Sequence, residues 1–186
     1  MKLKNIPCVL LCGGKSSRMG RDKCFLPFDE KNLINYQFDK TSQIFKQVFI
    51  SCKQDKFKGQ FKELIFDVSD EFSPMVALYS ILKSFEKSFV FILCVDMPFV
   101  SKACVEKMAN FSDESSIIIA KTKQKTHFLC GFYHSSLAPL CLELLQKKIH
   151  KISTLFYQVG GKIVEFDEES EFANLNTVQE YELFKI

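Results

Sequence analysis

One short stretch constrains the fold more than any other: an apolar run that ends at a glycine-rich, basic bend. The run covers residues 7–11, and the bend covers residues 12–24, where three of the chain's seven glycines and its only two arginines fall. Glycine lets the backbone turn tightly and approach an anion, while arginine and lysine bind phosphate oxygens. Open α/β sheets bind ligands at the carboxyl ends of buried strands. The pattern therefore predicts a triphosphate site; the alternative is a surface turn with scattered basic residues.

The order of residues within the bend disfavours two common nucleotide sites. A Walker A loop needs Gly-Lys-Ser/Thr after a glycine and four intervening residues, whereas here Gly13-Gly14 comes first and Asp22-Lys23 comes last. The bend also lacks the G-x-G-x-x-G spacing of dinucleotide-binding loops. An ordinary ATPase and a nicotinamide-dependent dehydrogenase are therefore both disfavoured.

Length and composition indicate one globular domain over residues 1–186. A chain of this length with 47% hydrophobic content can bury a core without disulfide or metal staples. The longest apolar run, residues 89–95, is too short to span a bilayer, and the N-terminus lacks a signal-peptide pattern. A net charge of +3 is too small to mark a nucleic-acid-binding protein. We expect a cytoplasmic protein with neither a membrane nor a nucleic-acid partner.

Cysteines and histidines do not form a recognisable reactive pattern. The eight cysteines include no C-x-x-C pair and have no histidine at metal-ligand spacing, so we expect free thiols packed as small hydrophobic groups. The three histidines, His127, His134 and His150, fit no triad with a Ser or Cys nucleophile. Electrostatics and positioning, rather than covalent catalysis, are expected to dominate the chemistry.

Apolar runs alternate with segments of helical periodicity along the chain. Runs typical of strands buried on both faces lie at residues 48–50, 89–95 and 117–120. Apolar residues recur at helical spacing over residues 75–82 and 137–145. A late strand follows Gly160-Gly161, and a final helix begins near Thr177. The alternation predicts an α/β fold, a three-layer α/β/α sandwich with a mostly parallel central sheet and right-handed crossovers.

Asp96 follows the most apolar run directly and precedes Met97-Pro98. A carboxylate at the end of a strand, beside a phosphate-binding loop, can hold Mg²⁺, which prefers oxygen ligands and shares its shell with substrate phosphates. The alternative is a helix cap, although Ser101 is better placed to cap the next helix. We expect Asp96 to bind Mg²⁺.

Asp67 ends another short apolar run, residues 64–66. We expect this carboxylate to bind polar groups of the nucleoside, with Asp70 as a close rival. Both residues are also common turn formers, so a purely structural role is the alternative for either.

Several segments together resemble the molybdenum cofactor guanylyltransferases. Residues 11–23 are similar to that family's L-A-G-G-x-S-x-R-M-G-x-D-K pattern, with Cys12 in place of the usual Ala. Three later segments also match: Asp96-Met97-Pro98 is similar to D-x-P, Cys130-Gly131-Phe132-Tyr133 to a G-L-Y strand, and residues 172–177 to F-x-N-x-N-T. The matches run from one end of the chain to the other. The C-terminal Asn pair makes the combination more selective than the first motif alone.

The resemblance implies a Rossmann-like nucleotidyltransferase fold and an enzyme that transfers GMP from GTP to the terminal phosphate of molybdenum-molybdopterin. Pyrophosphate would be released, and Mg²⁺ would be the cofactor. GTP and molybdenum-molybdopterin would be the substrates. Transient docking with cofactor-delivery or acceptor proteins fits the same chemistry.

The resemblance also assigns roles by position. Nucleotide contacts fall on Leu11, Cys12, Gly13, Gly14, Ser51 and Asp67. Phosphate binding falls on Arg18 and Lys23, which with the metal-binding Asp96 form the expected catalytic set. Contacts to the pterin substrate fall on Asn174 and Asn176.

Two departures from the family pattern concern recognition of the base. Residues 73–77, Ser-Pro-Met-Val-Ala, stand where the family commonly has G-P-L-x-G, and Ser51 stands where Asn is typical. The choice of guanine therefore rests on whole-chain resemblance. The alternatives are a cytidylyltransferase, a sugar-phosphate nucleotidyltransferase, and a non-catalytic nucleotide-binding or cofactor-binding module.

Overall fold

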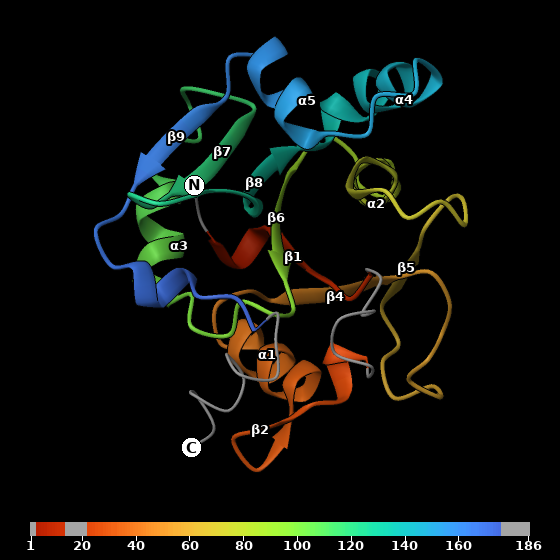
Figure 1. The fold of residues 1–186 in the computed structure, drawn as a ribbon, viewed down its shortest axis with the longest axis vertical. Helices are drawn as coiled ribbons and strands as arrows, with labels where there is room; N and C mark the ends of the chain where they lie inside the picture. The colour runs from red at the N-terminus through yellow and green to blue at the C-terminus, as the bar shows by residue number, and fades with distance from the viewer. Residues whose placement is uncertain (1–2, 14–21, 176–186) are drawn as a thin grey trace.

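A computed structural model describes residues 3–13 and 22–175. These residues form a seven-stranded sheet with helices on both faces (Figure 1), and the strand order is β5-β4-β1-β6-β8-β7-β9. The strands of this sheet are β1 (Pro7–Leu11), β4 (Gln47–Cys52), β5 (Leu64–Phe66), β6 (Phe89–Cys94), β7 (Ile117–Lys121), β8 (Thr126–His134) and β9 (Lys162–Glu165). A separate small hairpin pairs β2 (Pro27–Phe28) with β3 (Lys31–Asn32).

The helices lie between these strands in the chain. The α-helices are α1 (Leu33–Ser42), α2 (Pro74–Leu82), α3 (Lys102–Ala109), α4 (Ala138–Gln146) and α5 (Ile152–Gln158). Short 3₁₀ turns are η1 (Leu3–Asn5), η2 (Lys23–Phe25), η3 (Ser135–Leu137) and η4 (Glu169–Phe172). As expected, Ser101 caps α3, because its side chain accepts a hydrogen bond from the Cys104 N–H. The helix expected from Thr177 lies outside the described residues.

The prediction of a mostly parallel sheet is confirmed. β1 pairs in parallel with β4 and β6, β4 with β5, and β7 with β9. Only β8 runs antiparallel to its neighbours β6 and β7 within the described sheet. The link from β7 to β8, residues 122–125, is too short for the crossover that parallel neighbours require.

Strand β1 is buried along its whole length and separates two hydrophobic cores. Cys8 and Leu10 pack into the core on the side of α1 and α3. Val9 and Leu11 pack into the other core, with residues of α2, α4 and α5. Successive side chains of a strand point to opposite faces, so one run of five apolar residues supplies both cores. The expected three-layer α/β/α sandwich is therefore confirmed.

The cysteines behave as the sequence predicts: all eight are free, and all but the half-buried Cys94 are buried. Across residues 3–13 and 22–175, the helices are too short and too polar to cross a membrane.

Candidate active site

The carboxyl ends of four parallel strands meet at one edge of the sheet. They are Leu11 of β1, Cys52 of β4, Phe66 of β5 and Cys94 of β6. The backbone hydrogen bonds between β1 and its neighbours extend one residue beyond the strand ends. The Cys12 N–H donates to the Ser51 carbonyl at 2.9 Å, and the Val95 N–H donates to the Leu11 carbonyl at 3.1 Å. The residues that follow these strands are therefore held side by side, at the edge where α/β sheets bind ligands.

An ammonium and a carboxylate meet at this edge. Lys23 Nζ donates to Asp96 Oδ2 at 2.7 Å, and the two side chains are 19% and 15% exposed. Lys23 begins η2, whose N-cap Asp22 accepts a hydrogen bond from the Cys24 N–H through Oδ1. The structure thus brings the end of the basic bend to the carboxylate that follows β6.

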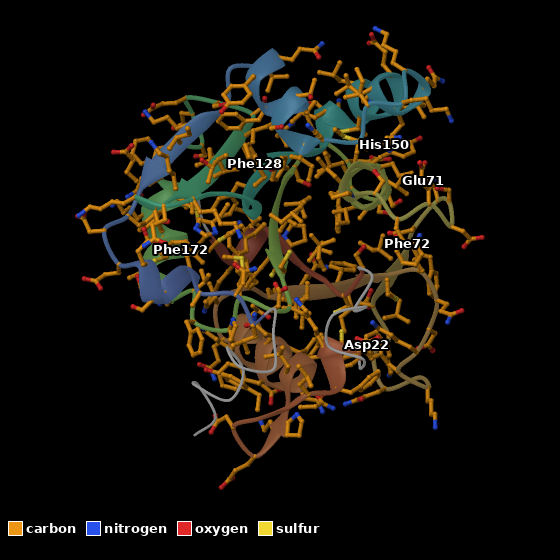
Figure 2. The ribbon with its side chains drawn as sticks, viewed as in Figure 1. Asp22, Glu71, Phe72, Phe128, His150 and Phe172 are labelled. Carbon is orange, nitrogen blue, oxygen red and sulfur yellow. The ribbon has the colours of Figure 1, made fainter. Side chains whose placement is uncertain are left out.

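The segment after η4 reaches the same carboxylate from a distant part of the chain. Asn174 Nδ2 donates to Asp96 Oδ1 at 3.2 Å, and the Leu175 N–H donates to the Asp96 carbonyl at 2.8 Å. The buried ring of Phe172, labelled in Figure 2, packs against the His127 ring with 5.1 Å between centroids. Both carboxylate oxygens of Asp96 therefore have a hydrogen-bond donor in the unliganded protein.

A buried glutamine supports the loop that carries Asp96. Gln37 on α1 is inaccessible to solvent, and its Nε2 donates to the carbonyls of Val95 at 3.3 Å and Met97 at 3.0 Å. These two residues flank Asp96, so the backbone on both sides of the carboxylate is held by one side chain. Sequence analysis missed Gln37, because nothing in the helical pattern of residues 33–42 indicates which strand end it will contact.

A cavity of about 280 Å³ opens at the same edge of the sheet. The ends of β1, β5 and β6 and the beginning of α2 supply its walls. Its lining residues are Leu11, Gly13, Lys53, Asp67, Phe72, Ser73, Pro74, Ala77, Cys94 and Leu129. An apolar cavity with a few polar groups is typical of sites for small organic ligands.

Asp67 is the carboxylate of this cavity. Its side chain is 6% exposed, and Lys53 Nζ lies 3.8 Å from Oδ2. The other oxygen, Oδ1, is buried and has no hydrogen-bond partner among the described residues. Burial raises the pKa of Asp67, and the nearby Lys53 ammonium offsets part of that rise. Because an unsatisfied buried acceptor is costly, Oδ1 is suited to accept a hydrogen bond from a ligand.

Asp70, the alternative residue for nucleoside binding, is exposed and does not line the cavity.

An aromatic residue and a lysine form the outer wall of the cavity. Lys53 Nζ donates to the Glu71 carbonyl at 2.9 Å and lies 4.5 Å from the centroid of the Phe72 ring. Phe72 is 56% exposed although it lines the cavity. Figure 2 shows Glu71, Phe72 and His150 along one side of the molecule. An exposed aromatic at a cavity mouth offers a surface on which a planar base can stack.

Ser73 and Ala77 occupy the two positions where the resembling family commonly has glycine, and both line the cavity. Ser73 caps α2, because its Oγ accepts a hydrogen bond from the Val76 N–H at 3.4 Å. The same hydroxyl lies 3.0 Å from His150 Nδ1. Compared with two glycines, this chain therefore adds a hydroxyl and a methyl group to the cavity wall.

The remaining predicted residues fall into three groups. Leu11 and Gly13 line the cavity. Ser51 is 1% exposed, and its Oγ has no hydrogen-bond partner in the described part of the chain, but it is not a lining residue. Gly14, Arg18 and Asn176 lie outside the described residues.

Sequence analysis also missed Lys53 and Lys56. Lys56 Nζ donates to the Cys12 carbonyl at 2.8 Å and to Asp22 Oδ2 at 2.6 Å. Burial alone would raise the pKa of Asp22, but hydrogen bonds from Lys56 and from the Cys24 N–H lower it below its ordinary value. Several lysines lie close together in residues 53–62, and their spacing does not indicate which of them contacts the basic bend.

The described residues offer charge and positioning rather than an enzyme nucleophile. Burial raises the pKa of Cys12 and Cys94 well above the ordinary value, so both thiols stay protonated. Burial, assisted by Lys125, lowers the pKa of His127 to about 4. Within the described ranges, no three His, Cys, Asp or Glu side chains form a group that could hold a metal by themselves. A lone carboxylate beside a lysine suits a metal–phosphate ligand better than a protein-only metal cage.

Comparison with known proteins gives a consistent result. Residues 8–160 match the family described as MobA-like NTP transferase domain. A molybdenum cofactor guanylyltransferase of Campylobacter jejuni is 50% identical over an alignment covering 100% of this chain and 98% of the relative. One from Helicobacter pylori is 31% identical over 97% of this chain and 92% of the relative. The crystal structure of molybdopterin-guanine dinucleotide biosynthesis protein A from Archaeoglobus fulgidus superposes with a TM-score of 0.81 at 20% identity, covering 97% of each chain.

Proposed function

This chain belongs to the molybdenum cofactor guanylyltransferase family, and we propose that it transfers GMP from GTP to the terminal phosphate of molybdenum-molybdopterin. The observation that carries the proposal is the meeting of Lys23 and Asp96 at the sheet edge that also holds the Asp67 cavity. A nucleotidyltransferase needs a cation for the triphosphate, a carboxylate for its metal and a cavity for the nucleoside. The lysine, the carboxylate and the cavity at one edge of the sheet support the proposal, because they match these three needs.

The acceptor brings its own nucleophile. A terminal phosphate oxygen of molybdopterin attacks the α-phosphorus of GTP, a new phosphorus–oxygen bond forms, and the bond to the β-phosphate breaks. The electron pair of that bond leaves with pyrophosphate. No covalent enzyme intermediate is required, so the protein has to align the two phosphates in line and neutralise their charge.

Lys23 and Arg18 are proposed to bind the phosphate oxygens. Lys23 pairs with Asp96, so its ammonium lies at the sheet edge where the triphosphate is expected. A lysine ammonium acts on phosphate as a compact point charge, whereas the Arg18 guanidinium provides bidentate hydrogen bonds. Fixed cations that do not reorganise during the reaction stabilise the charge that develops on the departing pyrophosphate.

Asp96 is proposed to bind Mg²⁺. This ion commonly binds one or two protein carboxylates and completes its coordination shell with water and substrate phosphates. A single carboxylate at the sheet edge is consistent with this coordination. When bound, the ion would neutralise phosphate charge. Asn174 supports the assignment, because its amide donates to Oδ1 and so fixes the plane of the carboxylate.

The cavity is proposed to bind the nucleoside. Asp67 Oδ1 would accept a hydrogen bond from it, and the exposed Phe72 ring would cover one face of the base. The backbone at residues 11–14 would contact the nucleotide beside it, and Ser51 would contribute from the neighbouring strand. Asn174 and Asn176 are proposed to contact the pterin substrate.

Because GTP is a cytosolic nucleotide, we expect the reaction to take place in the cytoplasm. Transient docking with cofactor-delivery or acceptor proteins is part of the same proposal.

The test is pyrophosphate release by the purified protein with molybdenum-molybdopterin and Mg²⁺, measured with GTP and separately with CTP. We expect release with GTP and background rates with CTP. A preference for CTP would identify a cytidylyltransferase. Turnover with a sugar phosphate in place of molybdopterin would identify a sugar-phosphate enzyme, and no release with any acceptor, against an active control enzyme, would identify a binding module.

A further inference from the structure

Lys56 is a cation that the proposed reaction does not yet use. It lies in the loop between β4 and β5, and its side chain is 21% exposed. Its ammonium donates to two acceptors that are distant in the chain from it: the Cys12 carbonyl at 2.8 Å and Asp22 Oδ2 at 2.6 Å. Cys12 is the first residue of the basic bend, and Asp22 lies near its end.

Each acceptor is itself fixed to a part of the site. The Cys12 N–H donates to the Ser51 carbonyl, which attaches Cys12 to the end of the sheet. Asp22 accepts a hydrogen bond from the Cys24 N–H through its other oxygen, Oδ1, and so caps η2, the turn that begins with Lys23.

We propose that Lys56 is a positioning residue for nucleotidyl transfer. Its ammonium ties the end of β1 at Cys12 to the cap of η2 at Asp22, and this tie sets the Lys23 ammonium beside Asp96. The inference rests on the proposed function for its kinetic consequence, although the tie itself belongs to the unliganded protein. Lys56 acts through Asp22 and Lys23 and need not touch the substrate.

The exposure of the pair favours positioning over stabilisation. The Lys56 and Asp22 side chains are 21% and 37% exposed, and ion pairs this accessible to solvent add little to the stability of a folded chain. In contrast, small displacements of a group that aligns reacting phosphates lower rates strongly. Removing the tie should therefore reduce activity far more than it reduces the melting temperature.

The experiment compares Lys56→Met with wild type and with Lys62→Met. Methionine keeps the apolar length of the lysine stem and removes the charge. Lys62 is an exposed lysine of the same loop, so it controls for the loss of one positive charge from that loop. We expect kcat/KM for GTP to fall by about 10²-fold in Lys56→Met. Lys62→Met should match wild type, and the unliganded melting temperatures should agree within about 3 °C.

Asp22→Asn tests whether Lys56 acts through Asp22. Asparagine keeps an oxygen for the Cys24 N–H but removes the charge that pairs with Lys56. If Lys56 and Asp22 act through one contact, their effects are not independent. The double variant should then be about as active as the less active of the two single variants. Losses that multiply, or that follow a fall in melting temperature, would contradict positioning.

Hydrogen exchange tests the tie without any turnover. Amides of residues 23–26 should exchange faster in Lys56→Met, whereas amides of β6 should be unchanged. Unchanged exchange at residues 23–26 would overturn the proposal even if activity falls. Failure of the wild-type protein to turn over GTP, with faster exchange in Lys56→Met, would overturn the proposed function and leave the tie standing.

Discussion

Lys23 Nζ lies 2.7 Å from Asp96 Oδ2, although 73 positions separate the two residues in the chain. The contact forms because Lys23 lies near the end of the basic bend that follows β1, while Asp96 follows the adjacent parallel strand β6. Neighbouring parallel strands end at the same edge of a sheet, so the two groups meet there. In the proposed function this contact preorganises the site, because Lys23 and Asp96 are close enough together for one triphosphate to reach both.

Lys23→Ala and Asp96→Ala should each retain the fold and lose turnover. Both side chains sit at the sheet edge rather than in either core. We expect kcat to fall by about 10²- to 10³-fold in each variant, the range seen when a preorganised charge-stabilising group is removed. Circular dichroism reports the fold and pyrophosphate release reports turnover. A folded variant with a near-normal rate would remove that residue from the mechanism.

Asn174 should matter through the hydrogen bond that its amide donates to Asp96. In Asn174→Ala the carboxylate loses one donor, and we expect kcat to fall by about tenfold, equivalent to one hydrogen bond to a charged group. In Asn174→Asp a second carboxylate replaces a donor 3.2 Å from Asp96 Oδ1, and like charges at this distance repel. The Asp variant should therefore be slower than the Ala variant. Equal rates for the two would show that Asn174 does not act on Asp96.

Asp67→Asn should weaken GTP binding without lowering the stability of the fold. The buried Oδ1 without a partner among the described residues makes the charged Asp67 costly in the unliganded protein, and burial raises its pKa. Neutralising it should leave the free energy of unfolding unchanged or raise it by about 1 kcal/mol, while GTP affinity falls about tenfold. Calorimetric titration with GTP and Mg²⁺ measures the affinity. Asp70→Asn is the matched control, and an equal loss in both variants would argue against a specific role for Asp67.

The fold was largely predictable because its signal is local. The apolar runs at residues 7–11, 48–50 and 117–120 became strands within a residue or two, since a strand buried on both faces needs only a continuous apolar run. The capping of α3 by Ser101 was equally readable, because a cap and its helix are adjacent in sequence.

The contacts that hold the site residues in place were not predictable from the sequence, because they join segments that are distant in the chain. Gln37 points from a helix to the carbonyls beside Asp96, and Lys56 crosses from another loop to Cys12 and Asp22. Neither has a spacing or a motif that distinguishes it from other Gln and Lys residues. The apolar pattern of β8 likewise gave no sign of its antiparallel direction, since that direction depends on the length of the turn before the strand.

Acid should destabilise the protein through His127. Burial first, and Lys125 second, lower its pKa from 6.5 to about 4, so between these values the unfolded chain binds a proton that the folded chain does not. Stability therefore falls as the pH drops through this window, by about 2 kcal/mol between pH 7 and pH 5 for one such group. The His127→Phe variant has no titratable group at this position. Its free energy of unfolding in urea should therefore change by about 2 kcal/mol less than that of wild type between pH 7 and pH 5. The same pH dependence in both proteins would exclude His127 as the cause.

Gly131 should be intolerant of even one methyl group. A Cβ at this position of β8 would lie 2.2 Å from the Ile118 carbonyl oxygen, a backbone atom that cannot rotate away. We expect Gly131→Ala to lose about 3 kcal/mol of stability or more. Gly59→Ala is the comparison, because its Cβ would meet open space and only its positive φ of 77° is unfavourable, at a cost of about 1 kcal/mol. Similar losses in the two variants would contradict the close approach of β7 and β8.

The most direct measurement follows a radioactive label placed on the α-phosphate of GTP through one turnover with molybdenum-molybdopterin and Mg²⁺. Attack at the α-phosphorus predicts that this label joins the molybdopterin product, and that a label on the γ-phosphate leaves with pyrophosphate. The label should stay in GTP when Lys23→Ala or Asp96→Ala replaces the wild-type protein. Transfer of the γ-label to molybdopterin, or an undiminished transfer of the α-label by both variants, would contradict the account.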